Sequence, residues 1–99
     1  MPYIGSVTQI GGYKIGVVAP ADVTTSLTWF YIRKDRVSEV ESLTHSGALP
    51  PISKTIATNV ARIVLIVATQ GGGALITIDG GNPQEVSANP DANIVFDVT

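Results

Sequence analysis

The chain has 99 residues, a formal net charge of −2 and no cysteine. This length predicts one domain over residues 1–99, and the lack of cysteine excludes a disulfide framework, a thiolate nucleophile and a cysteine-based zinc site. The six Lys and Arg residues are scattered, whereas binding to phosphates needs a clustered basic face, so we expect no nucleic-acid partner.

The first third of the chain predicts three strands. Val, Ile and Thr make up about a third of all residues, which favours strands over helices. Tyr3–Ile10 and Tyr13–Ala19 form the first two predicted strands, and Gly11-Gly12 between them fits a tight hairpin because both glycines accept positive φ. Val23–Lys34 is a longer strand with one face formed by Val23, Thr25, Leu27, Trp29 and Tyr31.

Residues 35–46 permit two interpretations. Val37, Val40 and Leu43 recur every three residues, and Asp35 could cap a short helix. Alternatively, the chain turns at residues 33–36 and returns as a polar strand. The surrounding β pattern favours the strand.

The second half predicts further strands separated by turns. Gly47–Pro51 is expected to be a loop, and Asn59, Gly71–Gly73, Asp79–Pro83 and Asn89–Asp91 are expected to break or turn the chain. The spacing predicts an all-β fold, a single mostly antiparallel β-sandwich or flattened barrel of about eight short strands. The predicted strands of this half are Ile52–Thr58, Val60–Gln70, Ala74–Asp79, Gln84–Ser87 and Ile94–Val98.

Residues 60–67 are apolar on both faces of a strand. Alternate positions place Val60, Arg62, Val64 and Ile66 on one face and Ala61, Ile63, Leu65 and Val67 on the other. Such a strand needs two covers, so the second is either another sheet of this chain or a neighbouring subunit. The residues expected to pack in the core or between subunits are Ile63, Val64, Leu65, Ile66 and Val67.

No catalytic or metal-binding pattern stands out. His45 is the only histidine, and the eight Asp and Glu residues are explained by turns and solubilising edges. Gly71–Gly73 precedes a strand rather than the helix of a phosphate-binding loop. We therefore expect no enzyme activity, no metal and no cofactor.

The aromatic residues Trp29 and Tyr31 leave two alternatives open. On an exposed β face they could stack on a sugar ring, which would make the protein a lectin-like carbohydrate-binding module. The favoured alternative is that Trp29 fills the core, because a chain this small needs the buried area of its one tryptophan. Accessibility of Trp29 distinguishes the two.

A pattern in the last two-fifths of the chain resembles a known group of proteins. An arginine-bearing strand, Val60–Ile63, leads to Ala74–Asp79, then to Gly80-Gly81-Asn82-Pro83 and to the closing strand Ile94–Val98. This pattern resembles small β-sandwich proteins attached to the virions of tailed phages. The usual Leu-Pro-Ala before the last strand is replaced by Asn89–Ala92. The resemblance implies a head decoration or cement role, usually oligomeric and non-enzymatic.

The expected function is therefore that of a structural protein that assembles. Charged residues make up 14% of the chain, against about 25% in average domains. Such surfaces tend to be covered by partners, although a small, Thr-rich β domain can reach the same composition alone. The longest apolar run is far short of the ~20 residues of a membrane span, and the N-terminus lacks a secretory signal. We expect a homo-oligomer, with a capsid protein as a further partner, located in the virion or in the host cytoplasm before assembly, and no membrane partner.

Overall fold

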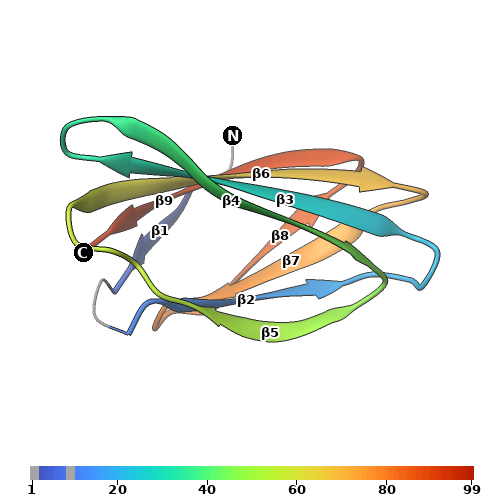
Figure 1. The fold of residues 1–99 in the computed structure, drawn as a ribbon. Helices are drawn as coiled ribbons and strands as arrows, with labels where there is room; N and C mark the ends of the chain where they lie inside the picture. Colours follow the sequence, from blue (N-terminus) through green and yellow to red (C-terminus); the bar gives the residue numbers. More distant parts are fainter. Residues whose placement is uncertain (1–2, 9–10) are drawn as a thin grey trace.

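The computed structural model describes residues 3–8 and 11–99, with only the backbone described for Glu39. This part of the chain contains nine β-strands and no helix (Figure 1). The strands are β1 (Tyr3–Val7), β2 (Tyr13–Val18), β3 (Thr24–Arg33), β4 (Val37–Ser46), β5 (Leu49–Lys54), β6 (Val60–Gln70), β7 (Ala74–Asp79), β8 (Gln84–Ala88) and β9 (Asp91–Val98).

The strands form two sheets that face each other, so the predicted β-sandwich is confirmed. A five-stranded sheet has the order β1-β9-β6-β3-β4, and a four-stranded sheet has the order β5-β2-β7-β8. Every pair of neighbouring strands is antiparallel except β1 and β9, which are parallel. Figure 1 shows the two layers, with β6, β9, β3 and β4 in one and β2, β5, β7 and β8 in the other.

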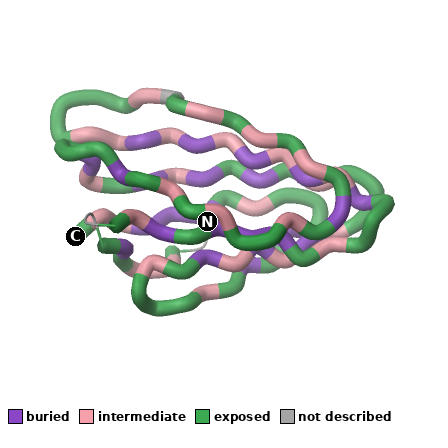
Figure 2. The backbone as a smooth tube through the Cα atoms, turned by 60° about the horizontal axis from the view of Figure 1, so that its bottom comes forward, coloured by how far each residue is buried: buried purple, intermediate pink, exposed green. Residues whose placement is uncertain are grey.

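The core lies between the two sheets and follows the alternation of the strands. Buried residues alternate with more exposed ones along most strands (Figure 2), as expected when one face of each sheet is covered. The Tyr13 and Phe96 rings meet edge to face with centroids 5.2 Å apart. The largest fully buried side chains include Trp29, Phe96, Ile15, Leu27, Ile63, Leu65, Ile76, Ile78 and Ile94.

The predicted hairpin between the first two strands is wrong. β1 pairs with β9 in one sheet, whereas β2 pairs with β5 and β7 in the other. Gly12 has a φ of 72°, and a Cβ there would lie 1.8 Å from the backbone oxygen of Lys54. This glycine therefore allows a close backbone approach to the end of β5. The predicted end of the first strand at Ile10 lies outside the described residues.

Residues 37–46 form a strand, which confirms the favoured interpretation of residues 35–46. β4 returns beside β3 after a turn in which the Arg33 N–H donates to the Arg36 carbonyl at 2.8 Å. The pairing is irregular at one point, because Trp29 lies opposite Glu41 but Phe30 lies opposite Glu39. Val40 is the extra residue of this β-bulge.

The predicted loop Gly47–Pro51 is too long, because β5 already begins at Leu49. Pro50 and Pro51 lie in this strand, which is possible because β5 is at the edge of its sheet, where a missing N–H need not break a ladder. β5 ends at Lys54 and not at Thr58. After β5 the chain leaves the sheet and buries Ile56 in the core.

Candidate interaction surface

The two faces of β6 have different environments. Ile63, Leu65 and Val67 are fully buried against the four-stranded sheet, so three of the five predicted packing residues belong to the core. Val64 is half-buried and Ile66 is 39% exposed on the opposite, outer face. Figure 1 shows no element of the described chain lying over that face. The second cover predicted for β6 is therefore not supplied by the described residues.

Apolar side chains of neighbouring strands extend this outer face. The register aligns Tyr3 of β1, Val95 of β9, Val64 of β6 and Phe30 of β3 in one row across the sheet. The row on one side contains Ile32 and the exposed Val37, and the row on the other contains Ile66. We call the set the outer apolar patch, consisting of Tyr3, Phe30, Ile32, Val37, Val64, Ile66 and Val95.

A charged network borders the outer apolar patch. The Arg62 Nε donates to Asp97 Oδ1 at 2.6 Å, and the Tyr3 hydroxyl donates to Asp97 Oδ2 at 2.5 Å. Both hydrogen bonds lower the pKa of Asp97, and the one from Arg62 has the larger effect. The hydrogen bond to Asp97 also raises the pKa of Tyr3. The network links β1, β9 and β6 and carries no net charge, because one arginine neutralises one carboxylate.

The other half of the outer face is lined by hydroxyl groups. Thr24 Oγ1 lies 3.2 Å from Ser46 Oγ, and Ser26 Oγ lies 3.4 Å from Thr44 Oγ1. These pairs join β3 to β4 beyond the outer apolar patch. The outer face therefore has an apolar half and a polar half, in which the exposed Asp91 lies opposite Ala68. The sequence showed the alternation on β3 but not which residues of β4 would lie beside it.

Trp29 and Tyr31 do not form the exposed platform that a carbohydrate-binding module requires. Trp29 is fully buried and Tyr31 is 5% exposed, because β3 turns both toward the core. The Trp29 Nε1 donates to the Tyr13 hydroxyl at 2.6 Å, and the Lys54 Nζ lies 4.4 Å from the Trp29 ring centroid. The prediction of a sugar-binding platform on these two residues is therefore wrong, and the core interpretation of Trp29 is confirmed.

These aromatic residues instead belong to a polar network at the edge of the core. The Tyr31 hydroxyl donates to Glu41 Oε1 at 3.3 Å, and Lys54 Nζ contacts Glu41 Oε2 at 3.0 Å. Burial, and next the negative charge of Glu41, raises the pKa of Tyr31 to about 12. The tyrosines therefore stay protonated, since burial also raises the pKa of Tyr13. Sequence reasoning missed this network, because its members lie on separate strands.

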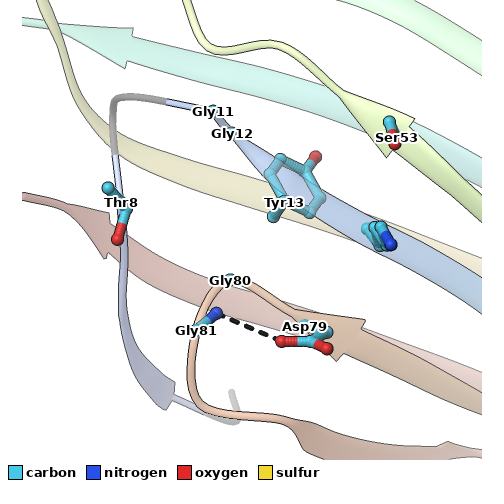
Figure 3. A pocket seen from close by; sticks show the side chains of 9 residues that line it. Thr8, Gly11, Gly12, Tyr13, Ser53, Asp79, Gly80 and Gly81 are labelled. Carbon is cyan, nitrogen blue, oxygen red and sulfur yellow. Dashed lines mark hydrogen bonds between the residues drawn. The ribbon is translucent and has the colours of Figure 1, made fainter.

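A hollow of about 300 Å³ opens at one end of the sandwich (Figure 3). Lys14, Ser53 and Asp79 bring polar side chains to it, and glycines of two turns form much of its wall. The Gly81 N–H donates to Asp79 Oδ1 at 3.1 Å, so the carboxylate already stabilises its own turn. No lining residue is a histidine, so the hollow lacks the imidazole of a nucleophile–base pair of the serine–histidine kind.

His45 lies on β4, and its ring contacts the loop that follows this strand. His45 Nε2 lies 3.0 Å from the Ala48 carbonyl oxygen. Within residues 3–8 and 11–99, no group of three or more His, Cys, Asp and Glu residues is placed to hold a metal ion. The same part of the chain contains no helix long and apolar enough to cross a membrane.

Comparison with known proteins does not assign the chain to a family. It matches no family model, and no curated protein or solved structure matches it significantly.

Proposed function

We propose that this chain is a non-enzymatic structural protein that acts by assembling, as a decoration or cement protein on the capsid of a tailed phage. One observation carries the proposal: the outer apolar patch of the five-stranded sheet is exposed at Val37 and Ile66, although its member Val95 is only 7% exposed, and no described element lies over the outer face. The resemblance of residues 60–98 to virion-associated β-sandwich proteins supports the choice of a capsid as the surface to which the assembled chain binds.

The size of the outer face agrees with a subunit interface. The five strands have 5, 8, 11, 10 and 10 residues. With strands about 4.8 Å apart and about nine residues long on average, the sheet is roughly 19 Å wide and 30 Å long, or ~570 Å² in projection. A standard interface buries about 800 Å² of accessible surface on each partner. The outer apolar patch alone is too small for this, so the partner must also cover the hydroxyl-lined half.

The chemistry of the face has the arrangement that interfaces use. Apolar side chains lie together, and hydroxyl groups beside them form a polar rim that can exchange hydrogen bonds with a partner or with water. Arg62 is paired with Asp97 beside the patch, so covering this region does not bury an uncompensated charge. A partner surface that is apolar beside the patch and has a hydrogen-bond donor or a positive charge opposite Asp91 fits this face.

The test uses particles of the phage that encodes the chain, purified from a strain lacking its gene. The purified chain is mixed with these particles and separated on a density gradient. We expect the unaltered chain and the control variant Ser87→Lys, whose change is exposed on β8, to move with the particles. Ile66→Lys is expected to stay at the top, because it places a charge in the outer apolar patch.

Two results would contradict the proposal. The first is failure of the unaltered chain to bind particles that lack it. The second is equal binding by Ile66→Lys and Ser87→Lys. The genes next to this one give an independent check, since a structural role on a virion predicts neighbours that encode capsid, portal or tail proteins.

A further inference from the structure

The outer edge of β4 differs from the other three sheet edges. β4 has ten residues, and no described strand pairs with its far side. The other edge strands carry features that discourage pairing. β5 contains Pro50 and Pro51, β8 has five residues, and β1 has five residues with Gly5 at a φ of 95° and an irregular register.

The regular part of β4 is the segment after its bulge, Glu41–Ser46. There each residue pairs one for one with β3, from Trp29 opposite Glu41 to Thr24 opposite Ser46. Glu41, Leu43 and His45 alternate with the exposed Ser42, Thr44 and Ser46. This segment is as long as an average strand, so it could accept one more strand along its whole length.

Symmetry limits how two copies can join through this edge. Two antiparallel strands related by a two-fold axis normal to the sheet keep their inward faces on the same side. Because alternate residues point to opposite faces, two residues that pair across the axis must have numbers that are both odd or both even. An axis at Leu43 places Leu43 opposite its own copy, Glu41 opposite His45 and Ser42 opposite Thr44. Axes at Ser42 or Thr44 instead place Leu43 opposite Glu41 or His45.

We infer that two copies of this chain pair through β4 about a two-fold axis at Leu43, joining their five-stranded sheets into one ten-stranded sheet. Only this register matches apolar with apolar, carboxylate with imidazole, and hydroxyl with hydroxyl across the junction. Hydroxyl pairs and matched apolar side chains facing each other across antiparallel strands stabilise the pairing. The backbone N–H and C=O groups along the far side of β4 supply the hydrogen bonds of the new ladder.

The side chains at the junction leave room for these contacts. Glu41 already contacts Lys54 and Tyr31, but an ionised carboxylate has about four acceptor positions. When both ring nitrogens carry a proton, His45 donates Nε2–H to the Ala48 carbonyl and has Nδ1–H for the carboxylate of the second copy. The inference concerns the edge of the sheet and not its outer face, so it does not depend on the proposed function.

Cysteine cross-linking tests the register, because the chain has no cysteine of its own. Directly opposite residues of antiparallel strands have Cβ atoms about 4.5–5.5 Å apart, close to what a disulfide needs, whereas diagonal neighbours are about 7–8 Å apart. Ser42→Cys and Thr44→Cys are made as separate variants. Ser87→Cys on β8 is the matched control, because all three positions are exposed.

Each variant, and an equimolar mixture of Ser42→Cys with Thr44→Cys, is oxidised and run on a non-reducing gel. We expect cross-linked dimer only in the mixture, in up to about half of the chains, since random pairing makes half of the symmetric dimers mixed. Absence of dimer in the mixture would overturn the inference. So would efficient cross-linking of Ser42→Cys or Thr44→Cys alone, which would indicate another register, or of Ser87→Cys, which would indicate random collision.

Discussion

Leu65 and Ile66 are adjacent on β6 but face opposite sides of the five-stranded sheet, so their alanine variants separate core packing from the outer face. Leu65 is fully buried, and Ile66 is 39% exposed. Leu65→Ala removes three buried carbon groups, worth about 2.4 kcal/mol at ~0.8 each, and leaves a cavity. We therefore expect a loss of about 3–4 kcal/mol from the free energy of unfolding. Ile66→Ala removes partly exposed atoms and leaves no closed cavity, so the expected loss is about 1–1.5 kcal/mol.

Urea unfolding measures both losses through the fluorescence of Trp29, the only tryptophan of the chain. The protein is diluted until the midpoint no longer depends on its concentration, so that assembly does not contribute to stability. The slope of unfolding against urea should be the same for both variants and the unaltered chain. Equal losses for the two variants would refute the assignment of Leu65 to the core and Ile66 to an open face.

Three further predictions concern single side chains elsewhere in the sandwich. Thr25→Val should stabilise the fold by up to about 1 kcal/mol in urea unfolding, because the buried Thr25 hydroxyl has no hydrogen-bond partner among the described residues. Gly80→Ala should lower the thermal midpoint, with a cost of about 1–3 kcal/mol, because its Cβ would lie 2.4 Å from Val7 Cγ1. The lowered pKa of Asp97 predicts that stability from its pair with Arg62 is fully present above about pH 4 and is lost as the pH falls through that lowered pKa. In Asp97→Asn this part of the acid-induced decrease in the urea midpoint should be missing.

Local pattern was enough to predict most strands and their inward faces. The predicted bounds of β6 and β7 agree with the structure, because turn-forming glycines and Asn59 limit both strands. Alternation along β3 likewise identified the residues that face the core. Periodicity and turn chemistry depend only on residues close together in the sequence, so they can be recognised without knowing which strands pair.

The local sequence pattern did not predict which strands pair with each other. Gly11-Gly12 has the composition of a hairpin turn, yet β1 pairs with β9 at the other end of the chain. Pro50 and Pro51 indicate a loop by composition, and only the position of β5 at a sheet edge makes them compatible with a strand. Both errors arise because pairing depends on residues far away in the sequence.

The candidate surface was predictable only in part. The two apolar faces of residues 60–67 predicted that both sides of this strand are covered. Ile66 is 39% exposed, so its side of the strand lacks such a cover in the described chain. The pairing of Arg62 with Asp97 and Tyr3 joins three strands and has no local signal. Trp29 had two interpretations. Its burial leaves no polar group without a partner, because the indole Nε1–H donates to the Tyr13 hydroxyl across the core.

Native mass measured by light scattering after size exclusion tests most directly whether the outer apolar patch is a subunit interface. The unaltered chain, Ile66→Lys and the control Ser87→Lys are compared at the same concentrations. We predict that the unaltered chain and Ser87→Lys share a mass several times the 10.3 kDa of one chain, and that Ile66→Lys has a smaller mass. Equal masses for all three proteins would contradict the account.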